Sequence, residues 1–126
     1  MAAISGKNTK PEIVLAEYVS HLGYRFRQNV TVLPGTPDIV FTRRKKVIFV
    51  HGCFWHGHAC KRATLPQTNK AFWKKKIEGN KHRDKRVRRE LTKLDWKSLV
   101  VWQCQITKSK EEKLKDRLKK FLRTTN

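Results

Sequence analysis

Residues 46–51, with the sequence KVIFVH, form a run that is apolar at every position between its two ends. A strand with one face in water alternates apolar and polar side chains, whereas a strand covered on both faces is apolar throughout. The run therefore predicts a central strand with other structure packed on both sides. Residues 38–41 and 98–102 are predicted to form further strands, and the basic turn at 43–45 joins the first of them to the central run.

Helical periodicity surrounds these strands. A first helix is predicted from the capping-box spacing at residues 9–12, with Pro11 in its first turn, to a stop at Gly23. The patterns beyond it predict a short strand at 24–27, a turn at 34–37, a helix at 69–79, a second helix with Val87, Leu91 and Leu94 on one face, and a basic amphipathic helix at 109–123.

The order of these elements is helix, strands, helices, strand and helix. Such an order predicts the α/β class, with a mixed β-sheet flanked by helices. At 126 residues the chain is long enough to bury a core, and we expect one domain over residues 1–126.

Charge restricts the class of partner. The chain has 30 Lys and Arg against 10 Asp and Glu, which gives a net charge of +20. A field of this sign attracts nucleic acid or anionic lipid. No apolar run approaches membrane-spanning length and no signal peptide precedes the first helix, so nucleic acid is favoured, no membrane partner is expected, and the protein is expected in the cytosol.

The segment that follows the central strand is rich in soft metal ligands. Cys53, His58 and Cys60 have the spacing C-x4-H-x-C, and Cys104 is the remaining cysteine. Three thiolates and one imidazole would close a tetrahedral zinc site, which would be structural because no position is left open for water. The alternative is that no metal is bound, that the cysteines are buried free thiols, and that the histidines lie on the surface.

Carboxylates and histidine indicate a second kind of site. Asp38 opens one strand and His51 ends the next, so pairing would place Asp38 beside the backbone of Val50 and the ring of His51. Mg²⁺ prefers carboxylate and carbonyl oxygens, and a histidine can accept a proton from a water that attacks phosphorus. The alternatives are turn chemistry for Asp38, helix capping for Glu12 and a solvated helix charge for Asp84.

Five blocks of the chain occur together in one order and spacing. They are GKNTKPE at 6–12, LPGTPD at 33–38, VHGCFWH at 50–56, Asn80-x-x-Arg83-Asp84 and Val101-Trp102-x-Cys104. With these blocks, the chain closely resembles the very-short-patch repair (Vsr) DNA mismatch endonucleases of bacteria. The resemblance runs over essentially the whole chain.

The resemblance implies a fold like that of the type II restriction endonucleases. It implies Mg²⁺-dependent nicking of duplex DNA on the 5′ side of the thymine in a T·G mismatch, which arises when 5-methylcytosine deaminates. We expect a monomer with duplex DNA as its partner, and the sequence leaves open whether mismatch-repair proteins are further partners. Two rival functions remain: a non-catalytic zinc-containing DNA-binding module, and a nuclease of the same fold with another mismatch or site preference.

The resemblance also implies residue roles. Asp38 and the carbonyl of Val50 hold Mg²⁺, His51 is the general base, His56 acts at the scissile phosphate, and Glu12 and Asp84 hold waters of the metal or orient the histidines. Structural zinc is bound by Cys53, His58, Cys60 and Cys104. DNA is contacted by an aromatic wedge of Phe54, Trp55 and Trp73 and by the N-terminal residues Met1 and Ile4.

A wedge of rings suits a mismatch because unstacking costs least where a base pair already stacks poorly. The alternative is that Phe54 and Trp55 are core residues. Two departures from the family stand out: Val50 replaces a frequent threonine, and the N-terminal arm is shorter than usual. The change at Val50 keeps a backbone carbonyl, while the shorter arm weakens the expected anchoring by Met1 and Ile4.

Overall fold

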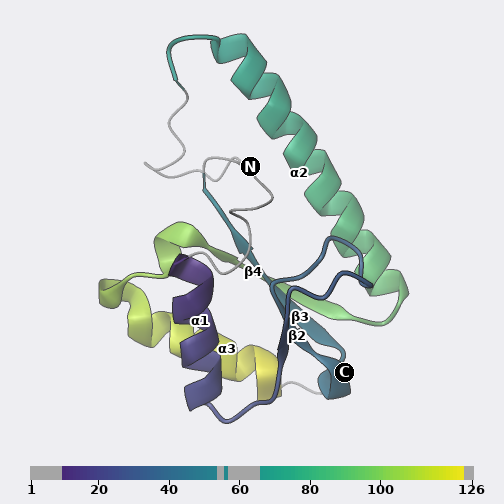
Figure 1. Cartoon of the computed structure of the whole chain (residues 1–126), viewed down its shortest axis with the longest axis vertical. Coiled ribbons are helices and arrows are strands. Elements are labelled where there is room, and N and C mark those ends of the chain that lie inside the picture. Colours follow the sequence, from purple (N-terminus) through teal and green to yellow (C-terminus); the bar gives the residue numbers. More distant parts are fainter. Residues whose placement is uncertain (1–9, 54–55, 57–65, 124–126) are drawn as a thin grey trace.

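The structure, a computed structural model, describes residues 10–53, 56 and 66–123. Its centre is a four-stranded sheet in the order β1-β2-β3-β4, with β1 at Arg27–Gln28, β2 at Ile39–Phe41, β3 at Lys46–His51 and β4 at Lys97–Trp102. The pairs β1–β2 and β2–β3 are antiparallel and β3–β4 is parallel. The predicted mixed sheet with flanking helices is confirmed (Figure 1). Likeness to restriction endonucleases stays a prediction.

Side-chain alternation divides the strands between two cores. Ile39 and Ile48 face helices α1 (Lys10–His21) and α3 (Glu111–Arg123), where they pack with Leu15, Val19, Leu114, Leu118 and Leu122. Figure 1 shows these two helices lying together on one side of the strands. The predicted buried faces of both helices are therefore confirmed, and β3 is covered on both sides as its composition required.

The other face of the sheet packs against α2 (Lys70–Lys93). Val40, Val47 and Phe49 form a second core with Leu91, against which Val87 also packs. Because strand side chains alternate with a period of two, His51 leaves β3 on the same face as Val47 and Phe49. This alternation directs His51 toward α2 and away from α1 and α3.

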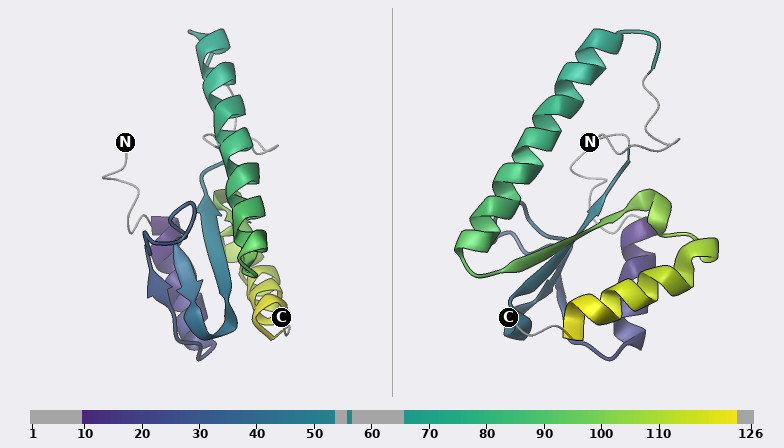
Figure 2. Two further views of the ribbon diagram at one scale, coloured as in Figure 1. Left: turned by 90° about the vertical axis from the view of Figure 1, so that its right-hand side faces the viewer. Right: turned by 180° about the vertical axis from the view of Figure 1, so that it is seen from behind.

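One continuous helix replaces the two that the sequence predicted between residues 69 and 94. The helix α2 runs unbroken through Gly79, and its N-terminal half extends beyond the sheet (Figure 2). A glycine inside a helix costs only about 1 kcal/mol relative to alanine, so it does not force a break. Leu94, expected on the packed face, follows the helix end and is 52% exposed.

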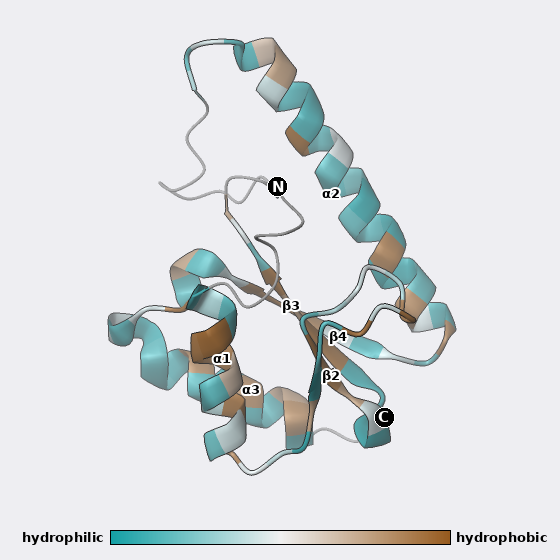
Figure 3. Ribbon diagram, viewed as in Figure 1, coloured by the Kyte–Doolittle hydropathy of each residue, from teal (hydrophilic) through white to brown (hydrophobic). Residues whose placement is uncertain are grey.

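Hydropathy agrees with this arrangement. Apolar residues gather where the strands meet the lower part of α2 and the helices α1 and α3, while most of α2 is hydrophilic (Figure 3). Within the described part of the chain, no helix combines the length and the apolar character needed to cross a membrane.

The predicted strand at 24–27 is also corrected, because pairing is confined to Arg27 and Gln28. Tyr24 and Phe26 instead pack their rings around Phe41, at centroid distances of 6.3 Å each. Packing of these rings against the core thus replaces extended pairing. The alternation of aromatic and basic residues at 24–27 therefore reflects partial burial of the rings and not pairing in a β-ladder.

Candidate active site

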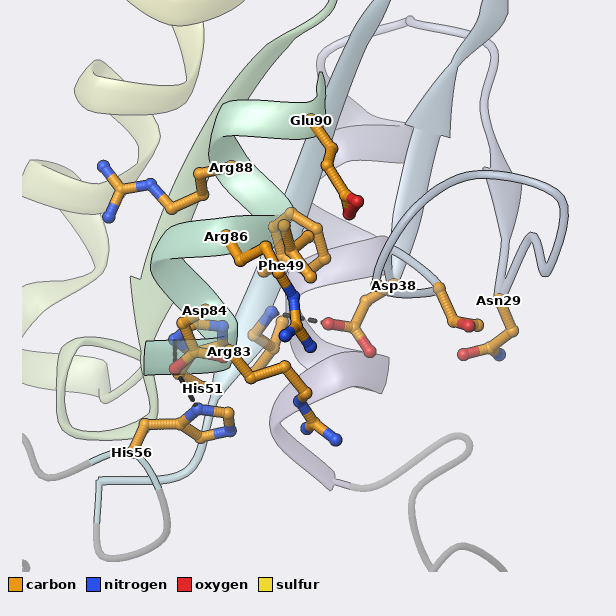
Figure 4. A pocket seen from close by; sticks show the side chains of 14 residues that line it. Asn29, Asp38, Phe49, His51, His56, Arg83, Asp84, Arg86, Arg88 and Glu90 are labelled. Atoms are coloured by element: carbon orange, nitrogen blue, oxygen red, sulfur yellow. Dashed lines mark hydrogen bonds and ion pairs between the residues drawn. The ribbon is translucent and has the colours of Figure 1, made fainter. Parts of the chain in front are cut away.

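A cavity of about 730 Å³ opens between α2 and the ends of β2 and β3. Figure 4 shows Asp38 on one side of it and Asp84 with His56 on the other. The side chains that can do chemistry here come from a turn, a strand end, a loop and a helix. The lining residues with polar or ionisable groups include Asn29, Thr36, Asp38, His51, His56, Arg83, Asp84, Arg86, Arg88 and Glu90.

Asp38 is positioned by the turn before β2. Its amide donates to the carbonyl of Ile48 at 3.2 Å, and its Oδ2 accepts from the amide of Val50 at 2.6 Å. The turn itself depends on Gly35, which has φ +77° and where a Cβ would lie 2.5 Å from Cγ1 of Val87. A side chain at this position would collide with α2, so glycine permits the close approach that fixes Asp38.

Asp38 also meets a second carboxyl group. Burial first, and then a hydrogen bond with Glu12, raise the pKa of Asp38 to about 8, although the hydrogen bond from the amide of Val50 lowers it. Glu12 lies in the first turn of α1 and is 6% exposed. Two carboxyl groups in such contact cannot both ionise without strong repulsion, so the contact favours the protonated form of Asp38.

Asp84 behaves in the opposite way. Its Oδ2 lies 2.6 Å from Nδ1 of His56, a short charge-assisted hydrogen bond. Burial raises the pKa of Asp84, but the bond with His56 and the nearby ring of His51 outweigh it and hold the pKa below its usual value. Asp84 is therefore an ionised acceptor, and the Nδ1–H of His56 donates a hydrogen bond to it.

The two histidines are stacked. The rings of His51 and His56 are 3.9 Å apart and nearly parallel at 7°, and the edge of Trp102 meets His51 at 5.2 Å. Nδ1 of His51 is buried without a hydrogen-bond partner, and its 3.9 Å separation from Asp84 is too long for one. Adjacent stacking means that a proton on one ring disfavours a proton on the other.

His51 is neutral at physiological pH. Burial first, and then the neighbouring His56, lower its pKa to about 4, while the Asp84 carboxylate acts in the opposite direction. A neutral imidazole has a free lone pair and can accept a proton. The cavity therefore brings together a carboxyl pair suited to a cation and a histidine suited to a proton.

Comparisons with known proteins point to one family. The family model described as "DNA mismatch endonuclease Vsr" matches residues 1–62. A relative from Escherichia coli K12, named DNA mismatch endonuclease Vsr, is 39% identical over 125 residues, which cover 97% of this chain and 80% of the relative. The chain belongs to the Vsr DNA mismatch endonuclease family.

Two further relatives are similar to the chain. The type II nicking enzyme V.XorIIP of Xanthomonas oryzae is 47% identical over 107 residues, or 85% of this chain and 79% of the relative. The type II nicking enzyme V.NmeAIP of Neisseria meningitidis is 42% identical over 106 residues, or 84% of this chain and 76% of the relative. Each is an endonuclease by name, and the protein is an endonuclease of this family.

The expected zinc ligands of this Vsr member fall partly outside the described residues. His58 and Cys60 lie there. Cys53 is fully buried and Cys104 is partly buried. Because His51 pairs with Trp102 in the parallel ladder, Cys53 and Cys104 each follow the last paired residue of adjacent strands by two positions. Two thiols at neighbouring strand ends fit half of a tetrahedral zinc set.

The residues expected to contact DNA are also divided. Met1, Ile4, Phe54 and Trp55 lie outside the described part of the chain. Trp73 lies in the first turn of α2, where its ring meets the ring of Phe72 edge to face at 5.1 Å. Phe72 is 59% exposed, so this end of α2 presents an aromatic surface.

Sequence reasoning gave several residues of the site no catalytic role. Arg83 and Arg86 project into the cavity from α2 (Figure 4), and Trp102 packs against both histidine rings. Arg83 and Arg86 lie within two residues of Asp84 on a predicted helix, and this spacing could have indicated that they share its site. The contact of Trp102 required the parallel register of β3 and β4, which no local pattern reveals.

Proposed function

We propose that the enzyme is a Mg²⁺-dependent, strand-specific endonuclease that nicks duplex DNA on the 5′ side of the thymine in T·G mismatches. It is proposed to act as a monomer in the cytoplasm, in very-short-patch repair of deaminated 5-methylcytosine. The observation that carries the proposal is the cavity in which Asp38, bonded to Glu12, shares one space with the His51–His56–Asp84 group. The name of the Escherichia coli relative supports a mismatch as the substrate.

Asp38 and the backbone carbonyl of Val50 are the groups proposed to hold Mg²⁺, and Glu12, bonded to Asp38, is proposed to hold a water of the metal. Two carboxyl oxygens already share a proton at this point, and a hard divalent cation favours the same oxygens once the proton leaves. When bound, Mg²⁺ supplies positive charge against the charge that develops on the scissile phosphate. The fit rests on the donor chemistry of these residues.

His51 is the proposed proton acceptor. As the oxygen of water bonds to phosphorus, a proton of that water passes to His51. The bond between phosphorus and the leaving oxygen breaks, and the leaving oxygen keeps the electron pair and takes a proton from solvent water. The carboxylate of Asp84 supports the positive charge that appears on the stacked rings. It also fixes His56 by the 2.6 Å hydrogen bond, so that the other nitrogen of His56 can face the phosphate.

Recognition of the mismatch is assigned to the aromatic residues Phe54, Trp55 and Trp73. Rings inserted beside a poorly stacked T·G pair pay a smaller unstacking cost than rings inserted beside a normal pair. Met1 and Ile4 are proposed to reach the same DNA from the N-terminal side. Zinc held by Cys53, His58, Cys60 and Cys104 would give the segment with Phe54 and Trp55 a rigid base.

A second specificity is favoured by one observation. The relatives with 47% and 42% identity are named type II nicking enzymes, and these names mention no mismatch. The alternative is therefore a nuclease of the same fold that nicks at another mismatch or at a particular site.

A cleavage assay separates these functions. Paired duplexes that differ only in T·G or T·A at one position are incubated with enzyme, with and without Mg²⁺. The proposal predicts one nick 5′ of the thymine in the T·G duplex, and only with Mg²⁺. Equal nicking of both duplexes would favour the alternative specificity, and no nicking with tight binding would indicate a DNA-binding module.

A further inference from the structure

A second groove, of about 790 Å³, lies where the C-terminal half of α2 meets the start of β4 and the end of α3. Four of the residues that line it are cations and two carry hydroxyl groups: Lys85, Arg88, Arg89, Lys97, Thr92 and Ser98. None of the described residues lining this outer groove is acidic. The outer groove is thus a concentrated patch of positive charge beyond the catalytic cavity.

The helix α2 separates the outer groove from the catalytic cavity. Lys85, Arg89 and Thr92 follow one another at helical spacing and share one face, whereas Arg83 and Arg86 line the catalytic cavity. At 3.6 residues per turn, the two sets are centred about 120° apart around the helix, so they line different spaces. Figure 2 shows this end of α2 beside the start of β4, with the end of α3 nearby. Only Arg88, among the described residues, lines both spaces.

The chemistry and length of the outer groove fit a phosphate backbone. The guanidinium and ammonium groups, with the hydroxyl of Ser98, are of the kinds that usually donate to phosphate oxygens. The hydroxyl of Thr92 already donates to the carbonyl of Arg88 at 2.9 Å. Lys85 and Thr92 are separated along α2 by about 10 Å at a rise of 1.5 Å per residue. That length equals about three nucleotide steps at 3.4 Å per strand, so a repeating polyanion fills the groove better than one small anion.

We infer that the outer groove binds a second segment of nucleic-acid backbone, separate from the phosphodiester that is cut. The net charge of +20 would draw such a segment to the protein, and the groove gives it a defined place. This inference does not depend on the T·G specificity or on the metal. A second segment held here would keep the enzyme on DNA while the catalytic cavity is empty or occupied.

Stoichiometry tests the inference. The probe is a fully matched duplex of about 12 base pairs, a stiff rod that cannot bend around α2 to reach both grooves at once. Sedimentation of a titration series counts the duplexes bound per chain. The test variant is Lys85→Gln with Arg89→Gln, two exposed positions outside the catalytic cavity. The control is Lys110→Gln with Lys113→Gln, which removes the same charge from exposed positions at the start of α3.

We expect wild type and control to bind two duplexes per chain and the test variant to bind one. The affinity of the second step should fall about tenfold or more, and its log–log salt slope should flatten by about 1.8 for two lost phosphate contacts. The nicking rate of the test variant on a short substrate should equal that of the control, so a failed nicking assay and a failed stoichiometry test remain distinct.

Equal stoichiometry in the test variant and the control would overturn the inference. So would binding of poly-glutamate that is lost in the test variant while DNA stoichiometry is unchanged, because this outcome assigns the outer groove to an acidic protein. Melting curves of all three proteins establish that the substitutions leave the fold intact.

Discussion

Asp38 and Asp84 lie in one cavity and have opposite electrostatics. The pKa of Asp38 is raised to about 8 and the pKa of Asp84 is lowered, although burial alone would raise both. The neighbours make the difference: Asp38 faces the carboxyl group of Glu12, whereas Asp84 faces two histidine rings. Environment, not residue type, therefore separates a side of the cavity that favours a cation from a side that handles a proton.

The largest expected effect on the nicking rate comes from a substitution on the side of the cavity that favours a cation. Asp38→Asn keeps the shape of the side chain but removes the carboxylate that Mg²⁺ requires, so the nicking rate should fall by about 10³-fold or more, since bound metal supplies several kcal/mol. Binding of T·G duplex without Mg²⁺ at pH 7 should be unchanged, because the Asp38 carboxyl favours its neutral form before the metal binds. Gel-based nicking and fluorescence anisotropy measure the two. A variant with a normal melting curve and wild-type nicking would contradict the assignment of Asp38.

Breaking the proton side should have a smaller effect that differs in kind. His51→Ala should slow nicking by about 10²–10⁴-fold, the usual contribution of a general base. Raising the Mg²⁺ concentration should not restore the rate, because the cation cannot accept the proton. Single-turnover rates over a range of Mg²⁺ provide the measurement. Recovery of the rate at high Mg²⁺ would instead place His51 in the cation site.

Asp84→Asn tests the support given to the histidines. Because the Asp84 carboxylate raises the pKa of His51, its removal should move the acid limb of the pH–rate profile to lower pH. The weaker base should also slow nicking by about 10–100-fold, as is typical when a partner of a catalytic group is lost. A lower rate with an unmoved acid limb would show that Asp84 acts only on structure.

The two sides should give opposite slopes in the pH dependence of stability. Asp38 has a pKa of about 8 in the folded state against 3.8, so between these values only the folded state holds the proton and stability falls as pH rises. His51 has a pKa of about 4 against 6.5, so in that window the unfolded state binds more protons and stability rises with pH.

These slopes oppose each other from about pH 4 to 6.5, and the contribution of Asp38 alone persists up to about pH 8. Relative to wild type in chelator, Asp38→Asn should lose the decline in melting temperature between pH 6.5 and 8. His51→Gln should show that decline over a wider range, beginning at lower pH. Differential scanning calorimetry gives the curves, and parallel curves for all three proteins would show that neither shift operates.

Much of the fold follows from local pattern. The apolar run of β3, the amphipathic α3 and the stop of α1 at Gly23 depend on burial periods and on a positive φ of 86°. The continuity of α2 could not be predicted from local pattern. Gly79 permits a break in the helix, but the cost of a glycine is small against the helix as a whole and does not force one. A local pattern shows where a helix can break, and tertiary packing decides whether it does.

The site divides in a similar way. Asp38 beside the backbone of Val50 follows from pairing two antiparallel strands across a short turn. The stack of His51 on His56 and the bond from His56 to Asp84 join a strand, a loop and a helix that are distant in sequence. Their meeting depends on how α2 crosses the sheet. The hydrogen bond between Asp38 and Glu12 likewise depends on where α1 docks.

In the proposed mechanism, Mg²⁺ binds at Asp38 and displaces the proton that this carboxyl group holds. Calorimetric titration of the DNA-free enzyme with Mg²⁺, in two buffers of different ionisation enthalpy, counts the protons released. We predict nearly one proton per Mg²⁺ at pH 7, a value approaching zero well above pH 8, and loss of the binding step in Asp38→Asn. Mg²⁺ binding at pH 7 without proton release, or binding that persists in Asp38→Asn, would contradict the claim.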